Sequence, residues 1–476
     1  MNKKPDLKVK VAIIGAGTAG MTAFREVQKV TDDWVMIHSG PFGTTCARVG
    51  CMPSKLFIQA ANDFHRRHKW NELGLHGADQ LSVDWPAVMK RVQTFRDRFV
   101  GGVLKTIDSI SNKIIHGTAQ FVEPQVLDVD GQRITADKII IATGSSPIVP
   151  VPWLSFNDRI LTTDEFFEQT EIIGPYAVVG TGVIGLELGQ ALSRLGIETH
   201  LFGDIPFIGG LTDPVVNDYA LQTLKEELNL HLGHRAELSK SKNTIGVTAG
   251  PVSTEVHQVL AAMGRKPNLK PLNLQAAGVP LDERGLPKFN PHTMQVEGLP
   301  LFLAGDINGD RPILHEAADE GRIAGYNAVR DDVIRFQRRT RLGITFSDPN
   351  LAYAGQSFEQ IKDTDHVVGE VRFDGQGRSL VMAKAKGILR VYVDKESGLL
   401  LGAEMVAPAG EHLAHLLSWA IQKKMTVHEA LAMPFYHPVV EEGLRTALRE
   451  ASKQVKAPRP QLEVPECHKL PHEDCS

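Results

Sequence analysis

The sequence predicts an α/β protein in which two strand–turn–helix units are followed by a smaller α+β region. Two observations support the units: a short apolar strand runs into a Gly-x-Gly-x-x-Gly turn near residue 15, and the same pattern returns near residue 180. A third observation is the change to strands and helices of mixed order from about residue 345. At ~150 residues per domain, a chain of 476 residues has room for about three domains.

The first unit has the order of a Rossmann-like nucleotide-binding unit. An apolar strand over 9–14 precedes the turn, and a helix is expected over 21–30. The turn contains three spaced glycines, Gly15, Gly17 and Gly20. The first permits a tight turn, the second lets a pyrophosphate approach the backbone, and the third lets the helix pack on the strand. The next strand, 34–37, ends at His38 instead of the usual ribose-binding acid, and an imidazole can still bond one ribose hydroxyl.

Between the two glycine turns lies a pair of cysteines, Cys46 and Cys51, which are two of only four in the chain. Positions five apart on a helix remain within reach, so the two sulfurs could close a short, strained disulfide. Such a bridge adds little stability and is labile, which suits redox turnover. Pro53 should kink or end the turn just after the second sulfur. So few cysteines favour a reducing compartment and a catalytic pair.

The chain from residue 56 to residue 152 continues the first unit. The pattern predicts helices and strands over 56–70, 85–109, 114–119, 126–129 and 138–144. The helices carry an apolar stripe that is core by default. The strands over 114–119 and 126–129 are expected to be antiparallel, with Asp130-Gly131 as a hairpin turn. Three prolines between 147 and 152 mark a linker.

The second unit repeats the first, with a strand over 176–179 and helix over 186–195. Its turn has the same three spaced glycines, Gly180, Gly182 and Gly185. The next strand ends in Gly203-Asp204, so the acid comes one position late, and no arginine cluster follows to receive a 2′-phosphate. This pattern favours NAD over NADP. Further on, a buried strand over 301–306 ends in Asp306, and a helix is expected over 315–329.

The last region is predicted to be α+β, and it contains a candidate histidine–carboxylate pair. We expect a meander of strands over 367–373, 379–386 and 388–393, then helices over 411–424 and 427–431. Pro438 keeps His437 out of a helix interior, so Glu442 could orient its imidazole. The residues alone leave open a surface histidine and a helix-start glutamate that favours the helix dipole.

Composition excludes several classes of protein. The formal net charge of −4 gives no electrostatic reason to expect nucleic acid or a membrane surface as a partner. No apolar run is long enough to span a bilayer, and the start of the chain has no secretory signal. We therefore expect a cytoplasmic protein.

Taken together, these motifs resemble the flavin-dependent pyridine nucleotide–disulfide oxidoreductases, most closely the dihydrolipoamide dehydrogenases, from about residue 9 to residue 452. The resemblance implies a homodimer with FAD on the first glycine turn and NAD on the second. It implies an FAD-binding domain over 1–150 continued by 269–344, an NAD-binding domain over 151–268, a dimerisation domain over 345–455 and a tail over 456–476.

The resemblance also implies roles for single residues. Cys46 would exchange with the substrate, Cys51 would lie against the flavin, and His437 of one subunit, held by Glu442, would complete the site of the other. Asp306 would bind the ribityl chain, and Lys55 would pair with Glu187 near the flavin ring. The implied cofactor-binding residues are Gly15, Gly17, Gly20, His38, Thr45, Lys55, Gly117, Thr143, Gly144, Gly180, Gly182, Gly185, Glu187, Gly264, Arg265, Asp306 and Leu314. No metal ligand is assigned.

The implied reaction is oxidation of dihydrolipoamide through the Cys46–Cys51 disulfide and FAD, with hydride passed to NAD⁺. A protein-bound dithiol and a 2-oxo acid dehydrogenase complex are candidate partners. The enzyme alternative is a reductase of another disulfide or of mercuric ion, and the non-enzyme alternative is a flavin-binding scaffold or sensor. The chain departs from the family pattern at four positions, His38, Thr44, Gly203 and Val439. The tail holds Cys467, His468, His472 and Cys475, either as a flexible end or as a metal-binding or thiol-relay arm.

Overall fold

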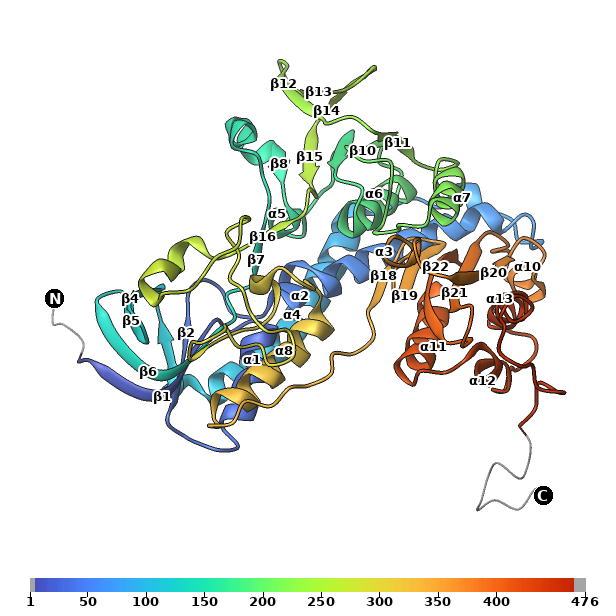
Figure 1. Ribbon diagram of the computed structural model, residues 1–476. Helices are drawn as coiled ribbons and strands as arrows, with labels where there is room; N and C mark the ends of the chain where they lie inside the picture. Colours follow the sequence, from blue (N-terminus) through green and yellow to red (C-terminus); the bar gives the residue numbers. More distant parts are fainter. Residues whose placement is uncertain (1–4, 466–476) are drawn as a thin grey trace.

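The computed structural model describes residues 5–465, and it confirms the predicted fold class. Figure 1 shows two lobes built on largely parallel sheets and a third lobe near the C-terminus, with long helices between them. The tail residues 466–476, including Cys467 and Cys475, lie outside the described residues. No helix among residues 5–465 is both long enough and apolar enough to cross a membrane.

The first sheet is centred on β1 (Leu7–Ile14), which pairs in parallel with β2 (Trp34–His38) and β6 (Gln132–Ile141). Its strand order is β3-β2-β1-β6-β5-β4, and β17 (Leu301–Leu303) pairs in parallel with the last residues of β6. The remaining strands are β3 (Ile114–His116), β4 (Ala119–Glu123) and β5 (Val126–Val129). The carboxyl ends of β1, β2, β6 and β17 therefore meet at one edge, where ligands of such sheets bind.

The prediction for one hairpin was partly wrong. β3 runs parallel to β2, so residues 114–116 do not form the expected antiparallel pair with 126–129. The antiparallel partners of β5 are β4 and β6, and Asp130-Gly131 is the turn between β5 and β6. The short apolar run Ile114–Ile115 extends the buried parallel sheet because β2 leaves a free edge there.

Two helices, α1 (Thr18–Val27) and α8 (Leu314–Ala328), pack closely together on this sheet. A side chain at Gly321 would collide with the carbonyl oxygen of Ala19, and one at Gly325 would collide with that of Ala23. Because both α8 positions are glycine, the helix backbones can approach one another. This packing brings the start of α8, and the turn before it, beside the first glycine turn.

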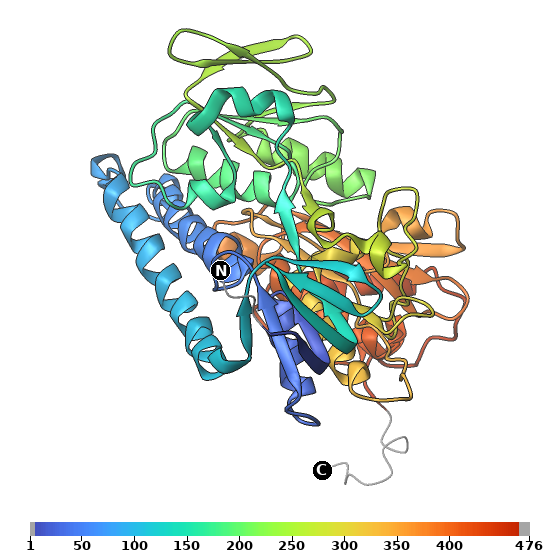
Figure 2. The same ribbon diagram turned by 90° about the vertical axis from the view of Figure 1, so that its left-hand side faces the viewer.

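The cysteines lie on a short helix and the long helix that follows it, α2 (Thr45–Val49) and α3 (Cys51–His65). α3 lies beside α4 (Trp85–Ser109), as both views show (Figures 1 and 2). α4 begins as the sequence predicts, because the Asp84 carboxylate accepts a hydrogen bond from the backbone N–H of Ala87 at 3.0 Å. α3 also contacts α6 (Val183–Arg194), so the cysteine segment joins the two nucleotide-binding lobes.

The second sheet is parallel throughout, in the order β11-β10-β9-β15-β8. Its strands are β8 (Ile160–Leu161), β9 (Tyr176–Val179), β10 (Thr199–Gly203), β11 (Asn229–Leu232) and β15 (Gln258–Ala261). It carries α5 (Thr163–Phe166), α6 and α7 (Pro214–Leu224). A small antiparallel sheet projects from this lobe at the top of Figure 1: β12 (Glu237–Lys240), β13 (Ile245–Ala249) and β14 (Val252–Val256). β7 (Ser145–Pro147) and β16 (Arg265–Pro267) pair where the chain enters and leaves the lobe.

The third sheet is antiparallel, in the order β18-β19-β22-β21-β20. Its strands are β18 (Leu342–Thr345), β19 (Asn350–Gly355), β20 (His366–Arg372), β21 (Ile388–Asp394) and β22 (Leu400–Ala407). Its helices are α9 (Phe358–Ile361), α10 (Gly377–Val381), α11 (Gly410–Gln422), α12 (Val427–Leu431) and α13 (Glu442–Ser452). The sheet begins three residues before the predicted start of the third domain at 345; the four domain boundaries remain a prediction.

The predicted strand over 379–386 is wrong, because α10 and a turn occupy this segment. The Gln376 side chain accepts a hydrogen bond from the backbone N–H of Ser379 at 2.8 Å and caps the helix. Leu380 and Val381, which favoured a strand, are mostly exposed. Sequence patterns also missed β18, β19 and β22, which lack a clear apolar alternation.

Candidate functional site

The two glycine turns have nearly the same backbone. The φ angles of Gly15 and Gly180 are +111° and +110°, a region that favours glycine. A side chain at Gly20 would collide with the carbonyl of Gly15, and one at Gly185 would collide with that of Gly180. Both turns therefore require glycine for the reason the sequence predicted, which is close packing of strand and helix.

The helix that follows each turn begins without a side-chain cap. Gly17 precedes α1 and Gly182 precedes α6, and the space where a side chain would project from either glycine is open. The first N–H groups of both helices are thus available to an anion, and the helix dipole favours negative charge there. The residues of both turns fit the pyrophosphate of a dinucleotide.

At the first turn, His38 bonds to the protein through both ring nitrogens. Its Nδ1 accepts a hydrogen bond from the N–H of Ala16 at 3.2 Å, and Nε2 lies 3.4 Å from the carbonyl oxygen of Pro41. Burial lowers the pKa of His38, so the ring is neutral with its proton on Nε2. The ring also stacks on Phe42. A bond to a ribose would require His38 to release one of these partners; here it ties the end of β2 to the glycine turn.

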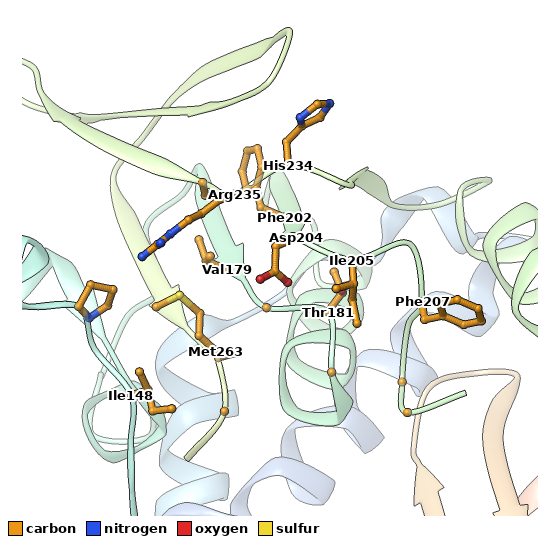
Figure 3. A pocket seen from close by; sticks show the side chains of 18 of the residues that line it. Ile148, Val179, Thr181, Phe202, Asp204, Ile205, Phe207, His234, Arg235 and Met263 are labelled. Carbon is orange, nitrogen blue, oxygen red and sulfur yellow. The ribbon is translucent and has the colours of Figure 1, made fainter. Parts of the chain in front are cut away.

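At the second turn there is a cavity of about 500 Å³ lined by Gly180, Gly182 and Gly264 among others. Asp204 and Arg235 reach into the same open space, whereas the His234 ring points away from it (Figure 3). A side chain at Gly203 would collide with the Thr181 hydroxyl, so the strand end has no room for an acid. Sequence reasoning missed Arg235, because it follows β11 and comes near the turn only through the parallel pairing of β10 and β11.

Asp306 opens a short turn of 3₁₀ helix after β17, and its carboxylate accepts a hydrogen bond from the Ser145 hydroxyl at 2.6 Å. Arg265 donates to the hydroxyl of Ser145 at 2.8 Å and to its carbonyl oxygen at 2.6 Å. Arg265 was predicted to bind cofactor. In the structure its guanidinium bonds to Ser145 of β7, the residue whose hydroxyl donates to Asp306.

The other predicted contacts lie around the same edge. Asn268 bonds to both Thr143 and Gly144 across the β7–β16 crossing. The N–H of Gly117 donates to the carbonyl of His38 at 3.0 Å, beside the first turn. Leu314 is the first residue of α8 and is exposed.

The cysteine pair is a free dithiol in which the two sulfurs differ in acidity. The thiol of Cys46 donates a hydrogen bond to the sulfur of Cys51, and this bond lowers the pKa of Cys51 to about 7 against the opposing effect of burial. The positive charge of Lys55 lowers it further. The same hydrogen bond raises the pKa of Cys46. Cys51 is therefore the more acidic of the two thiols.

Lys55 and Glu187 form the predicted pair across the two nucleotide-binding lobes. The Lys55 ammonium lies 2.6 Å from Oε2 of Glu187, whose side chain is buried. Oε1 of Glu187 accepts a hydrogen bond from the N–H of Phe346 at 2.9 Å, and Lys55 lies over the Phe346 ring. The carboxylate is thus satisfied on both oxygens, and Lys55 is held one helical turn after Cys51.

His437 and Glu442 form a hydrogen-bonded pair at the opposite end of the chain. Nδ1 of His437 lies 3.0 Å from Oε1 of Glu442, and the bond lowers the pKa of the carboxyl group. The His437 side chain is 80% exposed, and Nε2 points to no hydrogen-bond partner within residues 5–465. Neither residue contacts Cys46 or Cys51 in the described chain, so a site that joins them needs a second copy.

Comparison with known proteins decides the family. Residues 9–321 match the model of the pyridine nucleotide-disulphide oxidoreductases, and residues 342–448 match the dimerisation domain of that family. The chain belongs to the pyridine nucleotide-disulphide oxidoreductases.

Two curated members of this oxidoreductase family show the same degree of similarity. The chain is 28% identical over 450 residues to the dihydrolipoyl dehydrogenase of Bacillus subtilis, covering 92% of this chain and 97% of that protein. It is also 28% identical over 458 residues to a mercuric reductase of Staphylococcus aureus, covering 93% and 82%. Sequence identity to these two relatives therefore does not distinguish between their substrates.

Solved structures show the same fold. The Cu(II) complex of the HOCl-induced flavoprotein disulfide reductase RclA from Escherichia coli superposes with a TM-score of 0.81 at 21% identity, covering 94% of this chain and 99% of that one. LpdA from Mycobacterium tuberculosis superposes with a TM-score of 0.81 at 22% identity, and the match covers 93% of this chain and 99% of that one.

Membership in the oxidoreductase family establishes the coarse function. The protein is an FAD-dependent oxidoreductase that uses NAD(P)H, and its dimerisation domain supports a homodimer. This finding removes the flavin-binding scaffold or sensor from the alternatives, and it leaves the substrate to be proposed.

Thr44 departs from the family pattern at a position that still has the backbone of glycine. Its φ is +58° and its ψ is 149°, a conformation that costs a residue with a side chain ~1–3 kcal/mol. In partial compensation, the Thr44 hydroxyl caps α2 by accepting a hydrogen bond from the N–H of Ala47 at 3.3 Å.

We expect Thr44→Gly to raise the free energy of unfolding by about 1 kcal/mol, since relief of strain exceeds the loss of a cap and the added chain entropy. Thr44→Ala keeps the strain and loses the cap, so it should lower that free energy by about 1 kcal/mol. Denaturant unfolding of the three holoproteins measures both changes. A Thr44→Gly protein less stable than Thr44→Ala would contradict the assignment of strain.

We expect Lys55→Met to raise the pKa of the Cys51 thiol above its value of about 7, because a positive charge that favours the thiolate is lost. The midpoint of the alkylation rate of Cys51 by iodoacetamide should move to higher pH by about 1 unit. Glu187→Gln is the matched control: it removes the negative charge that opposes the thiolate, so the midpoint should not rise. An unchanged midpoint in Lys55→Met would show that the Cys46 hydrogen bond alone sets the acidity.

Proposed function

We propose that the enzyme oxidises a vicinal dithiol of the dihydrolipoamide type and passes the electrons to NAD⁺. The observation that carries this proposal is the His437–Glu442 pair, at 3.0 Å, in a chain that also has a cysteine pair of unequal acidity. Reducing a metal ion needs no base to deprotonate the substrate, whereas each thiol of a dithiol must lose a proton before its sulfur can attack. An oriented imidazole with a free Nε2 supplies such a base.

In the proposed reaction, Nε2 of His437 from one subunit takes a proton from a substrate thiol, whose sulfur attacks Cys46 of the other. The Cys46–Cys51 bond breaks, and Cys51 leaves as a thiolate, which its pKa of about 7 makes favourable. The second substrate thiol then gives up its proton to solvent, and its sulfur displaces Cys46, which takes the proton held by His437. The substrate is oxidised to a disulfide, and the enzyme is left with a thiol on Cys46 and a thiolate on Cys51.

Glu442 keeps the proton of the neutral imidazole on Nδ1, so that Nε2 faces the substrate. FAD bound at the first turn would supply two-electron transfer from the Cys46–Cys51 dithiol to the nicotinamide. Asp306, Lys55 and the first glycine turn are the residues we propose to hold it. Lys55 would also stabilise the Cys51 thiolate by its charge.

For the second nucleotide we propose NAD. Asp204 points into the cavity of the second turn, and no hydrogen bond or ion pair holds its side chain within residues 5–465. A free carboxylate can accept bonds from the ribose hydroxyls and repels a 2′-phosphate. Arg235 on the facing wall is the residue that would favour NADP, so its presence makes the comparison of NADH with NADPH informative.

A cytoplasmic location and service to a 2-oxo acid dehydrogenase complex belong to the same proposal. They are supported by the reducing conditions that a labile cysteine pair needs and by the likeness to dihydrolipoyl dehydrogenase.

A panel of substrates tests the proposal. Purified holoenzyme is assayed with dihydrolipoamide and NAD⁺ or NADP⁺, and in the other direction with lipoamide, glutathione disulfide and mercuric ion. We expect the highest kcat/KM with dihydrolipoamide and NAD⁺. If mercuric ion with NADPH is the preferred pair, then the chain is a metal-ion reductase. If another disulfide is preferred, then the substrate class of dithiols and disulfides is right, but lipoamide is the wrong substrate.

A further inference from the structure

Glu320, in the middle of α8, has no accessible surface and yet carries a carboxyl group. Burial raises the pKa of Glu320 to about 7. The positive charge of Arg338 and the hydrogen bonds to the carboxylate oppose that rise. A buried carboxylate is costly unless all of its partners are in place. The hydrogen-bond partners of Glu320 therefore identify the segments of the chain that its carboxylate holds in place.

Two of the three partners belong to the turn that presents Asp306. Oε2 of Glu320 accepts hydrogen bonds from the N–H of Gly305 and from the side-chain amide of Asn308, both at 2.7 Å. These residues flank Asp306 on either side of the 3₁₀ turn. Gly305 has a φ of +81°, a backbone conformation that glycine readily adopts, so the chain can turn directly after β17.

The third partner comes from the segment that leads to the third sheet. Arg338 donates to Oε1 of Glu320 at 2.6 Å and to Glu316 at 2.7 Å, and Arg311 donates to Glu316 at 2.8 Å. Glu316 is equally buried and lies one turn before Glu320 on α8, but it makes no bond to the Asp306 turn. The two glutamates thus share a network and differ in their contact with the turn.

We propose that Glu320 is a positioning residue that fixes the Gly305–Asn308 turn, and through it the Asp306 carboxylate, for the ribityl chain of FAD. This inference rests on the proposed role of Asp306. With Glu320 ionised, both ends of the turn are held by one oxygen, and the Asp306 side chain is free to face the cofactor and Ser145.

The test is the dissociation constant of FAD from reconstituted apoprotein, read by the quenching of flavin fluorescence. In Glu320→Gln an amide N–H₂ replaces one carboxylate oxygen and faces one of the groups that donate to Glu320, so that hydrogen bond cannot form. We expect FAD binding to weaken by about tenfold, as is usual when a charge-assisted hydrogen bond is lost. NAD⁺ affinity at the other lobe should stay unchanged. Glu316→Gln is the matched control, and its FAD affinity should stay within about twofold of the wild type.

Coupling to Asp306 separates positioning from general loosening. Asp306→Asn should weaken FAD binding in the wild type and have a smaller effect in Glu320→Gln, because the carboxylate is then already misplaced. Equal losses in Glu316→Gln and Glu320→Gln, or strict additivity with Asp306→Asn, would overturn the inference. If Asp306→Asn itself changes nothing, then the proposed role of Asp306 fails instead. Should Glu320→Gln not fold, Asn308→Ala removes a single bond to Glu320 and should weaken FAD binding by about threefold; an unchanged affinity would contradict the proposal.

Discussion

Cys46→Ser should lose at least about 10³-fold in dithiol oxidation, while NADH still reduces the flavin. Serine cannot form the disulfide that accepts electrons from the substrate. In the proposed mechanism Cys46 is the sulfur that exchanges with the substrate, and Cys51, whose pKa is the lower of the two, is the leaving thiolate. Steady-state turnover with dihydrolipoamide reports on dithiol oxidation. Anaerobic flavin reduction by NADH reports separately on electron transfer between the nucleotide and the flavin.

Cys51→Ser is the matched control, because it also breaks the disulfide but removes the other sulfur. It should abolish the long-wavelength absorption that a Cys51 thiolate beside the flavin gives, whereas Cys46→Ser should keep that absorption. A Cys46→Ser enzyme with more than about a tenth of wild-type turnover would contradict the role of the pair.

His437→Gln should lower kcat for dithiol oxidation by about 10² to 10⁴-fold, the range expected when a general base is removed. The reduced enzyme should still pass electrons to NAD⁺, since the imidazole acts only on thiol protons. Glu442→Gln keeps a group that can bond to Nδ1, and its loss should be smaller, about tenfold. Equal and large losses in the two variants would mean that Glu442 does more than orient the ring.

The exposure of His437 predicts that the site is shared between two copies. In a heterodimer of one Cys46→Ser chain and one His437→Gln chain, one site has both changes and the other has neither. Such a heterodimer, purified with two different tags, should keep about half of wild-type activity. If histidine and cysteine act within one chain, then neither site is intact and the heterodimer should be inactive.

The features predicted from the residue pattern itself are those set by neighbouring residues, whereas the long-range Lys55–Glu187 pair came from the family resemblance. Each glycine turn is a local arrangement of strand, tight turn and helix, and Gly15 and Gly180 adopt the φ values this requires. The Cys46–Cys51 segment and the His437–Glu442 pair are also local, because the two partners of each pair are five positions apart in the sequence. Such local patterns are predicted correctly because the tertiary contacts of the folded chain agree with the structure that the local sequence favours.

The features that sequence missed depend on partners far apart in the chain. Glu320 meets Gly305 and Arg338 only when α8 packs on α1, and nothing near any of the three marks the contact. His38 accepts a hydrogen bond from Ala16, 22 residues earlier, a contact that the strand pattern around His38 does not reveal; its bond to a ribose stays a prediction. The segment over 379–386 has strand-like apolar residues, yet a side-chain cap and the lack of a neighbouring strand make it a helix and a turn.

An anaerobic titration of the holoenzyme tests the central proposal most directly. Dihydrolipoamide is added in steps, then NAD⁺, while the visible spectrum of the flavin is recorded. We expect dihydrolipoamide to produce a long-wavelength band from the Cys51 thiolate beside the flavin, and NAD⁺ to remove it. If dihydrolipoamide leaves the spectrum unchanged while NADH reduces the flavin, then the cysteine pair does not accept electrons from this dithiol, and the proposed substrate is wrong.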